Sequence, residues 1–242
     1  MIDLFYYTSP NARKILIALE ELGVPYNLVW TNISEGDQFR PEFLNVNPNG
    51  KIPAIIDRDG PGVAPLPVFE SGAILLYLAE KFGRLLPATP AARWEAISWL
   101  TWQVSGQGPM CGQAAHFLSH AAKQGISQPY AAERYATEAR RRYGVLDTHL
   151  RNREWIAEEF SIADIACFPW TRVAKGHGVA LEEFPNVTRW SNAIAARPSA
   201  KRRPEDDADA PFKAPQGGYN NRQWEILFGR TAQPEPIKEA TA

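Results

Sequence analysis

Polar residues stand at three points where an apolar run gives way to a helical pattern or a strand begins, and these points could carry chemistry. The first is Ser9-Pro10-Asn11, which follows the apolar run 2–7. The first backbone N–H groups of a helix lack partners within the helix, and the helix dipole favours an anion there. The sequence therefore indicates an anion site at this turn, with Ser9 and Asn11 either as donors to the anion or only as helix caps.

The cysteines limit which group can be that anion. Cys111 and Cys167 are the two cysteines of the chain and neither belongs to a CxxC pair, which argues against a disulfide framework or a zinc knuckle. The turn at 9–11 has no cysteine, so a thiolate bound there must belong to a ligand. His116 and His120 can share a helix face, but no third ligand is evident, so no metal site is expected.

The other two points carry candidate binding residues. Lys51-Ile52-Pro53 begins a strand, and its proline is either a cis proline beside a ligand or an ordinary trans proline at a strand start. Glu70-Ser71 opens a helix, so Ser71 can cap that helix or bind a carboxylate with help from the helix dipole. Glu70 can pair with an ammonium group. Gln38 is a further polar residue, and we expect it beside the cleft that these binding residues would form.

The elements that must position these residues change in type along the chain. Strands are expected over residues 2–7, 26–31, 51–57 and 66–69, with helices over 15–22 and 73–81. This order, with its final hairpin, predicts a small α/β domain with a mixed sheet over residues 1–85. Residues 88–203 form an expected all-helical domain, with helices over 91–111, 129–151, 161–175 and 187–197. The fold class is therefore α/β plus all-α.

Two later segments have structural interpretations. Ser161-Ile162-Ala163-Asp164 resembles a capping box, with aspartate where glutamate or glutamine is usual, so Asp164 is expected to be structural. The tail 204–242 is polar and contains one amphipathic piece, 222–228, which we expect to dock as a short helix. This helix could cover the cleft or brace a dimer. The last ten residues are expected to be disordered.

Composition narrows the class of protein. The net charge is −1, from 26 basic and 27 acidic side chains, so there is no basic excess for nucleic acid or a membrane surface. No stretch approaches the roughly 18 apolar residues of a membrane span, and no signal peptide is evident. Together with the low cysteine content, these features predict a protein of the reducing, cytoplasmic compartment.

Four motifs in this order resemble the glutathione transferase superfamily, over about residues 2–203. They are Ser9-Pro10-Asn11, Asn49-Gly50-Lys51-Ile52-Pro53, Glu70-Ser71-Gly72-Ala73-Ile74 and Ser161-Ile162-Ala163-Asp164-Ile165-Ala166. The chain is most similar to the Nu class, the bacterial glutathione-dependent disulfide-bond oxidoreductases. That similarity lies in Gln38-Phe39-Arg40-Pro41-Glu42-Phe43, Trp102-Gln103-Val104, Gly108-Pro109-Met110 and Glu133-Arg134-Tyr135. The resemblance implies a thioredoxin-like N-terminal domain, a helical C-terminal domain and a homodimer.

The resemblance also implies roles for the residues at the first two points. Asn11 and Ser9 would donate to the thiolate of bound glutathione. Tyr7 is an alternative donor, because other classes of the superfamily use a tyrosine at the end of the first strand. Ile52, before a cis Pro53, would offer its backbone N–H and C=O to the cysteinyl unit of glutathione, in the manner of an added strand.

Further residues would hold the ends of the glutathione molecule. Ser71 would bind the γ-glutamyl carboxylate and Glu70 the α-ammonium, while Gln38 would contact the glycyl or cysteinyl end. Arg134 would reach the glutathione of the neighbouring subunit, although an arginine in such a run is also commonly solvated. Lys51 as partner of the glycyl carboxylate is inferred from its position alone, and a solvated lysine is an equal alternative.

The function implied is a glutathione-dependent disulfide-bond reductase, whose site would hold two glutathione molecules or glutathione disulfide and exchange thiol and disulfide. Two alternatives remain at this point. The first is a transferase that conjugates glutathione to small electrophiles, and the second is a non-catalytic glutathione-binding regulatory protein. The chain departs from its relatives at Ala157-Glu158-Glu159-Phe160, where they often carry glycines, so this loop is expected to be stiffer.

Overall fold

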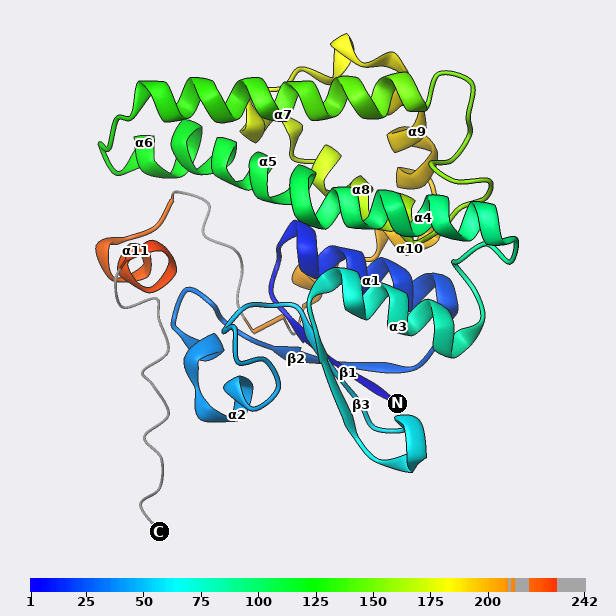
Figure 1. Cartoon of the computed structure of the whole chain (residues 1–242). Coiled ribbons are helices and arrows are strands. Elements are labelled where there is room, and N and C mark those ends of the chain that lie inside the picture. The colour runs from blue at the N-terminus through cyan, green and yellow to red at the C-terminus, as the bar shows by residue number, and fades with distance from the viewer. Residues whose placement is uncertain (209, 212–217, 230–242) are drawn as a thin grey trace.

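The computed structural model describes residues 1–208, 210–211 and 218–229 of the chain. The N-terminal half is a four-stranded sheet with α1 and α3 between it and the helical half (Figure 1). Its elements are β1 (Ile2–Tyr6), α1 (Pro10–Leu22), β2 (Tyr26–Trp30), η1 (Asp37–Phe39), α2 (Pro41–Leu44), β3 (Ala54–Asp57), β4 (Leu66–Phe69) and α3 (Ser71–Phe82). The strand order is β2-β1-β3-β4; β1 runs parallel to β2 and antiparallel to β3, and β3 pairs antiparallel with β4. This is the predicted thioredoxin-like arrangement, so the predicted fold class is confirmed.

The central strand and the first helix share one buried core. Leu4 and Tyr6 of β1 are fully buried together with Ile15 and Leu19 of α1. The period of two in the strand and the stripe at helical spacing in α1 place these apolar side chains on facing surfaces. α1 ends at Gly23, whose φ of 66° is the left-handed conformation that glycine adopts without a Cβ clash. The buried face of α1 therefore packs against the central strand, and the helix ends at Gly23.

The C-terminal half is helical, as predicted. Its helices are α4 (Pro90–Trp102), α5 (Gly108–Ala115), α6 (Ala121–Lys123), α7 (Pro129–His149), α8 (Ile162–Thr171), α9 (Pro185–Ala195) and α10 (Pro198–Lys201). The predicted helix 91–111 is part of a longer run, because two π-helical segments, η3 (Gln103–Gln107) and η4 (His116–His120), join α4, α5 and α6. Such segments carry a wider turn, are rare, and often mark functional positions. The proposed division of the chain at residues 85, 88 and 203 stays a prediction.

The start of α8 is anchored by Asp164, which is fully buried. Its carboxylate accepts the N–H of Ser161 at 3.0 Å, the N–H of Ile156 at 3.0 Å and the indole Nε1–H of Trp190 at 2.7 Å. The capping box is present, so the structural interpretation of Asp164 is confirmed. Burial raises the pKa of Asp164 to about 6, against the opposing effect of these hydrogen bonds.

The described part of the tail contains the helix α11 (Asn221–Phe228), close to the predicted position. The ring of Trp224 stacks on His116 with centroids 5.5 Å apart, and Arg222 lies 3.4 Å from the Glu35 carboxylate. α11 therefore contacts both halves of the chain, and it lies beside the α5–α6 end of the helical half (Figure 1). The predicted disorder of residues 233–242 falls outside the described residues. No helix within the described part of the chain has the length and apolar character to cross a membrane.

Candidate active site

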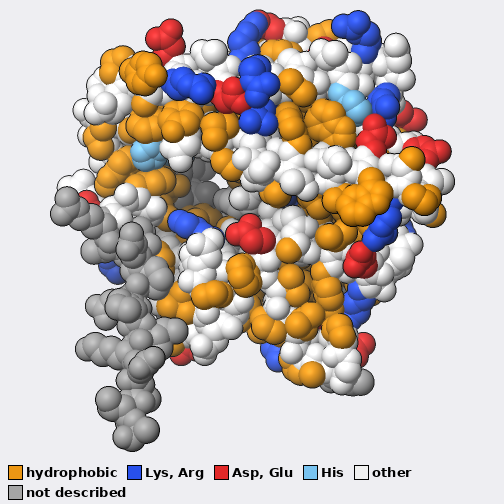
Figure 2. Space-filling view, viewed as in Figure 1, with side chains coloured by type: hydrophobic (Ala, Val, Ile, Leu, Met, Phe, Trp, Pro, Cys, Tyr) orange, Lys and Arg blue, Asp and Glu red, His pale blue; other side chains and the backbone are white. Residues whose placement is uncertain are grey.

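Two adjoining cavities lie between the start of α1, the start of α3 and the η3–α5 segment. Their volumes are about 510 Å³ and about 190 Å³. Asn11, Lys51, Glu70 and Ser71 line both, so the two cavities form one cleft, which we call the Asn11 cleft. Figure 2 views a face that is hollowed between the α/β half and the helical half.

Six of the predicted site residues meet in this cleft, although they come from three distant segments of the chain. They are Asn11, Lys51, Ile52, Pro53, Glu70 and Ser71. The Ile52-Pro53 peptide bond is cis, as predicted. Asn47 donates its side-chain N–H to the Lys51 carbonyl at 2.6 Å and so holds the turn that presents Ile52 to the cleft. The sequence motifs thus identify one side of a single site.

The side chain of Asn11 is oriented by a residue that the sequence analysis missed. Trp170, on α8, donates its indole Nε1–H to Oδ1 of Asn11 at 3.1 Å. An indole nitrogen can only donate, so this bond assigns the amide oxygen to Trp170 and leaves the Asn11 NH₂ group to donate elsewhere. Trp170 lines the same cleft. Its sequence position on α8 gave no sign of this contact, because the contact depends on how α1 and α8 pack.

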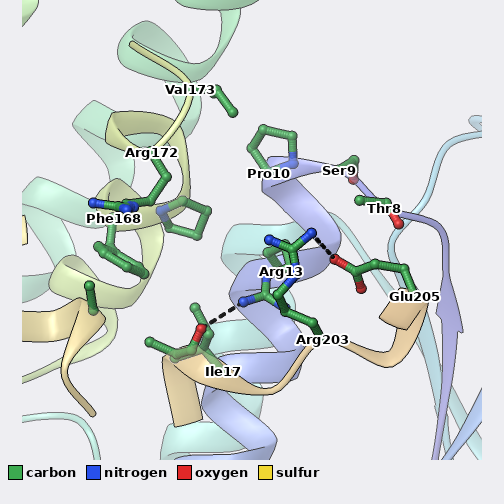
Figure 3. Close-up of a pocket in the computed structure, with 13 residues that line it drawn as sticks. Thr8, Ser9, Pro10, Arg13, Ile17, Phe168, Arg172, Val173, Arg203 and Glu205 are labelled. Atoms are coloured by element: carbon green, nitrogen blue, oxygen red, sulfur yellow. Dashed lines mark hydrogen bonds and ion pairs between the residues drawn. The ribbon is translucent and has the colours of Figure 1, made fainter. Parts of the chain in front are cut away.

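Ser9 is placed differently from Asn11. Its Oγ accepts the backbone N–H of Ala12 at 3.2 Å, so Ser9 is the N-cap of α1. Ser9 lines a separate cavity of about 490 Å³, with Arg203 and Glu205 on another wall (Figure 3), and this cavity shares no lining residue with the Asn11 cleft. The catalytic role of Ser9 therefore stays a prediction, and its capping role is observed.

The remaining predicted residues lie outside the lining of the Asn11 cleft. Tyr7 is buried and its hydroxyl lies 3.1 Å from Oγ of Ser34. Gln38 is buried, donates to the Ile33 carbonyl at 3.1 Å, and leaves its Oε1 without a partner in the described structure. A buried acceptor of this kind suits an N–H group of a ligand. Arg134 is exposed on α7, so its predicted contact would have to be made with a second copy of the chain.

The start of α3 differs from the expectation that Ser71 caps it. Glu70 occupies the N-cap position with φ of 69°, and its side chain makes no capping bond. A non-glycine residue in this region of φ is uncommon and often marks a functional position. Ser71 is instead the first residue of the helix, and its hydroxyl takes part in a different contact. The helix start therefore faces the cleft with its N–H groups uncapped by a side chain.

That contact involves Lys14, the second site residue that the sequence analysis missed. Its side chain is only 1% exposed, lines the Asn11 cleft, and donates to Oγ of Ser71 at 3.1 Å and to Oε1 of Gln103. Burial lowers the pKa of Lys14 to about 7, and nearby Cys167 and Glu70 oppose this shift. Ile17 and Ala18 follow Lys14 at helical spacing on the buried face of α1. That spacing was the sequence signal that could have indicated a buried Lys14.

The chemistry of the cleft follows from these groups. The uncapped start of α3, Ser71 and the buried ammonium of Lys14 favour a carboxylate, whereas Glu70 favours an ammonium. Asn11 presents an N–H donor at the start of α1, where an anionic sulfur would also be favoured. Among the residues that the structure describes, no cluster of three or more histidine, cysteine, aspartate or glutamate side chains could hold a metal ion.

The fold and the cleft define a class: a two-part, thioredoxin-like protein with a polar cleft at the starts of two helices of its N-terminal half. Residues 8–81 match the N-terminal domain of glutathione S-transferases, and residues 111–198 match their C-terminal domain. The chain belongs to the glutathione S-transferase family.

Its relatives include proteins with a stated activity or a bound ligand. The chain is 48% identical over 201 residues to Disulfide-bond oxidoreductase YfcG of Escherichia coli strain K12. This alignment covers 82% of this chain and 92% of that protein. A glutathione transferase from Pseudomonas putida, solved with one glutathione disulfide bound per subunit, has a TM-score of 0.79 and 43% identity, covering 83% of this chain and 89% of that chain. One from Burkholderia graminis, with two glutathione molecules per subunit, has a TM-score of 0.77 and 44% identity, covering 82% and 85%.

Proposed function

We propose that the protein is a glutathione-dependent disulfide-bond oxidoreductase whose sulfur nucleophile belongs to bound glutathione. The observation that carries this proposal is the Asn11 amide, fixed as a donor by Trp170 at a helix start that has no cysteine. Cys111 and Cys167 are both fully buried, and burial raises the pKa of the Cys111 thiol to about 12. A buried thiol with a raised pKa is a poor nucleophile, so the reactive sulfur has to enter with the ligand.

The groups of the cleft bind glutathione from one end to the other. Ser71 and the start of α3 hold the γ-glutamyl carboxylate, and Glu70 pairs with the α-ammonium. The backbone of Ile52 pairs with the cysteinyl unit, and Gln38, which lies outside the lining of the cleft, accepts an N–H near the cysteinyl or glycyl end. Lys51, which is exposed at the rim, pairs with the glycyl carboxylate. With these contacts the sulfur would lie beside Asn11, and Ser9 and Tyr7 stay predicted donors although neither lines the Asn11 cleft.

Catalysis then consists of positioning and anion stabilisation. The glutathione thiolate, stabilised by the Asn11 N–H and the α1 dipole, attacks one sulfur of the substrate disulfide. The disulfide bond breaks, a glutathione–substrate mixed disulfide forms, and the other substrate sulfur leaves as a thiolate that takes a proton from solvent. A second glutathione thiolate attacks the mixed disulfide, which yields glutathione disulfide and the second substrate thiol. Two glutathione molecules are oxidised for each disulfide reduced.

The protein would work as a cytoplasmic homodimer. Arg134 is exposed on α7 and does not line the Asn11 cleft of its own chain, which suits a contact with the glutathione of a partner subunit. Size-exclusion chromatography with light scattering is expected to give twice the chain mass of 27.0 kDa. A monomer would remove the proposed role of Arg134 across the interface.

Disulfide reduction and conjugation can be distinguished in one assay. Purified protein is mixed with glutathione and hydroxyethyl disulfide, and the reaction is coupled to glutathione reductase and NADPH. A parallel sample contains an aryl halide in place of the disulfide. We expect fast disulfide reduction and slow conjugation.

Each other outcome has a definite meaning. Fast conjugation with slow disulfide reduction would contradict the proposal in favour of a conjugating transferase. Inactivity in both samples, with glutathione still bound by calorimetry, would indicate a regulatory or binding protein. Absence of glutathione binding would overturn the assignment of the Asn11 cleft altogether.

A further inference from the structure

Lys14 is a buried cation between the two helix starts of the Asn11 cleft. It lies on α1, one turn after Asn11, and its ammonium donates to Ser71 at the start of α3 and to Gln103 of η3. Charged side chains are rarely fully buried unless they are paired, because desolvation disfavours the charged form. Here the two bonded partners are neutral, so the protein itself leaves this charge only partly compensated.

The contact with Lys14 determines what the Ser71 hydroxyl can do. When Lys14 is protonated, its ammonium group has three donors and no acceptor, so Oγ of Ser71 has to accept from it. The hydroxyl hydrogen of Ser71 must then point to a different acceptor. Ser71 is only 6% exposed, and that exposed part lines the cleft. The hydroxyl is thereby prepared to donate to a carboxylate that enters the cleft at the start of α3.

The surrounding charges make the protonation of Lys14 responsive to such a carboxylate. The titratable groups that face the ammonium are Glu70, at the N-cap of α3, and Cys167, on α8. Glu70 is exposed at the rim, and Cys167 is fully buried, where burial raises its pKa and keeps the thiol neutral. In the free protein, burial therefore dominates and lowers the pKa of Lys14. A ligand carboxylate held by Ser71 would add a second nearby negative charge and favour the charged ammonium.

We propose that Lys14 is a positioning residue of the glutathione site, which orients the Ser71 hydroxyl toward the γ-glutamyl carboxylate and takes up a proton when that carboxylate binds. This inference rests on the proposed function, because it takes glutathione as the ligand of the Asn11 cleft. Its physical basis is linkage: an anion that stabilises the protonated form of a group must bind more tightly when that group is protonated. The affinity for glutathione therefore falls as the pH rises through neutrality.

The test uses S-methylglutathione, whose blocked sulfur cannot release a proton of its own. Calorimetric titrations of the full-length protein in buffers with different ionisation enthalpies count the protons taken up on binding. Near pH 7.5 we expect uptake of about half a proton by the wild type, decreasing toward zero below about pH 6, where Lys14 is already charged. Lys14→Met is expected to bind about tenfold more weakly and to take up no proton.

Two further variants separate positioning from general damage. Lys175→Met removes an exposed lysine outside the lining of the Asn11 cleft and is expected to keep the wild-type affinity and proton uptake. In a Ser71→Ala background, Lys14→Met is expected to cost no more than about threefold in affinity, because the hydroxyl that Lys14 orients is absent. Fully additive effects of the two substitutions would overturn the positioning role.

The wild-type titration also separates this inference from the proposed function. Binding of S-methylglutathione without proton uptake at any pH from about 6 to 8.5 would refute the role of Lys14 and leave the glutathione site intact. No binding at all would refute both. If Lys14→Met does not fold, the wild-type proton count still decides the question.

Discussion

The two helices that begin at the Asn11 cleft start in different ways. At α1, Pro10 has no N–H, and the N–H of Ala12 is already bound by the Ser9 hydroxyl. At α3, the side chain of the N-cap residue Glu70 makes no capping hydrogen bond, and Ser71 accepts a hydrogen bond from the buried Lys14. The start of α1 is thus partly satisfied by the protein, whereas the start of α3 is left for a ligand.

This difference assigns the two helix starts to different parts of the reaction. An uncapped helix start with a hydroxyl and a buried cation is a strong site for a permanent anion such as a carboxylate. A capped start contributes less through its backbone, so the side chain of Asn11 has to supply the donor to the sulfur. We therefore expect substitutions at α1 to alter turnover and substitutions at α3 to alter affinity.

The largest effect is expected from Asn11→Ala. Loss of one preorganised donor to a developing or bound anion lowers kcat by about 10²–10³-fold in comparable sites. The affinity for glutathione should change by less than about threefold, since the carboxylate contacts at α3 are intact. Steady-state disulfide reduction and calorimetric titration measure the two quantities. Unchanged turnover would remove Asn11 from the mechanism.

Ser71→Ala is expected to show the opposite pattern. Removal of a hydrogen bond to a charged ligand group weakens binding by roughly 10–100-fold, while kcat at saturating glutathione changes little. Titration with glutathione, followed by rate measurements at saturation, provides the comparison with Asn11→Ala. A loss of kcat as large as in that variant would mean that the two helix starts act as one unit.

Ser9→Ala removes the cap of α1. The free energy of unfolding should fall by about 1 kcal/mol, as measured by urea denaturation, and the affinity for glutathione should stay close to that of the wild type. Ser9→Asn, which retains a capping side chain, is the matched control and should recover most of the stability. An affinity loss equal to that of Ser71→Ala would abolish the distinction between α1 and α3.

The smallest effect concerns the pH dependence of stability of the ligand-free protein. Because the pKa of Lys14 is lowered on folding to about 7, the unfolded chain binds more protons than the native protein above that pH. The contribution of Lys14 therefore makes the free energy of unfolding rise with pH, by at most about 1 kcal/mol between about pH 7 and pH 8. Denaturation of wild type and Lys14→Met at both values should show this rise only in the wild type. An equal dependence in both would contradict the buried, titrating lysine.

Much of the fold could be predicted because its signals are local. The strand at 66–69 and the capping box at Ser161 each follow from neighbouring residues. The π-helical segments η3 and η4 could not be predicted, since their sequences keep the composition of an ordinary helix. They depend on how α4, α5 and α6 pack.

The candidate site also contains residues that the sequence predicts and residues that only tertiary packing brings in. Asn11 and Ser71 stand at turns, where a polar residue after an apolar run is visible in the sequence. Lys14 and Trp170 act on these residues from within helices, and their contacts join segments 57 and 159 residues apart. A pattern of residue types along one chain does not record which side chains meet across such distances. Residues that line the cleft were therefore predicted, and the residues that contact Asn11 and Ser71 were found only in three dimensions.

The burial of Cys111 and Cys167 has a consequence for the resistance of this protein to oxidation by disulfides. Enzymes that attack disulfides with a resident thiol become oxidised in each cycle, and a partner has to restore them. In the proposed reaction, every sulfur that changes oxidation state belongs to glutathione or to the substrate, while both resident thiols are buried. Such a catalyst would have no oxidised form that needs repair after an oxidative burst. Its turnover would depend on the supply of reduced glutathione and of the disulfide.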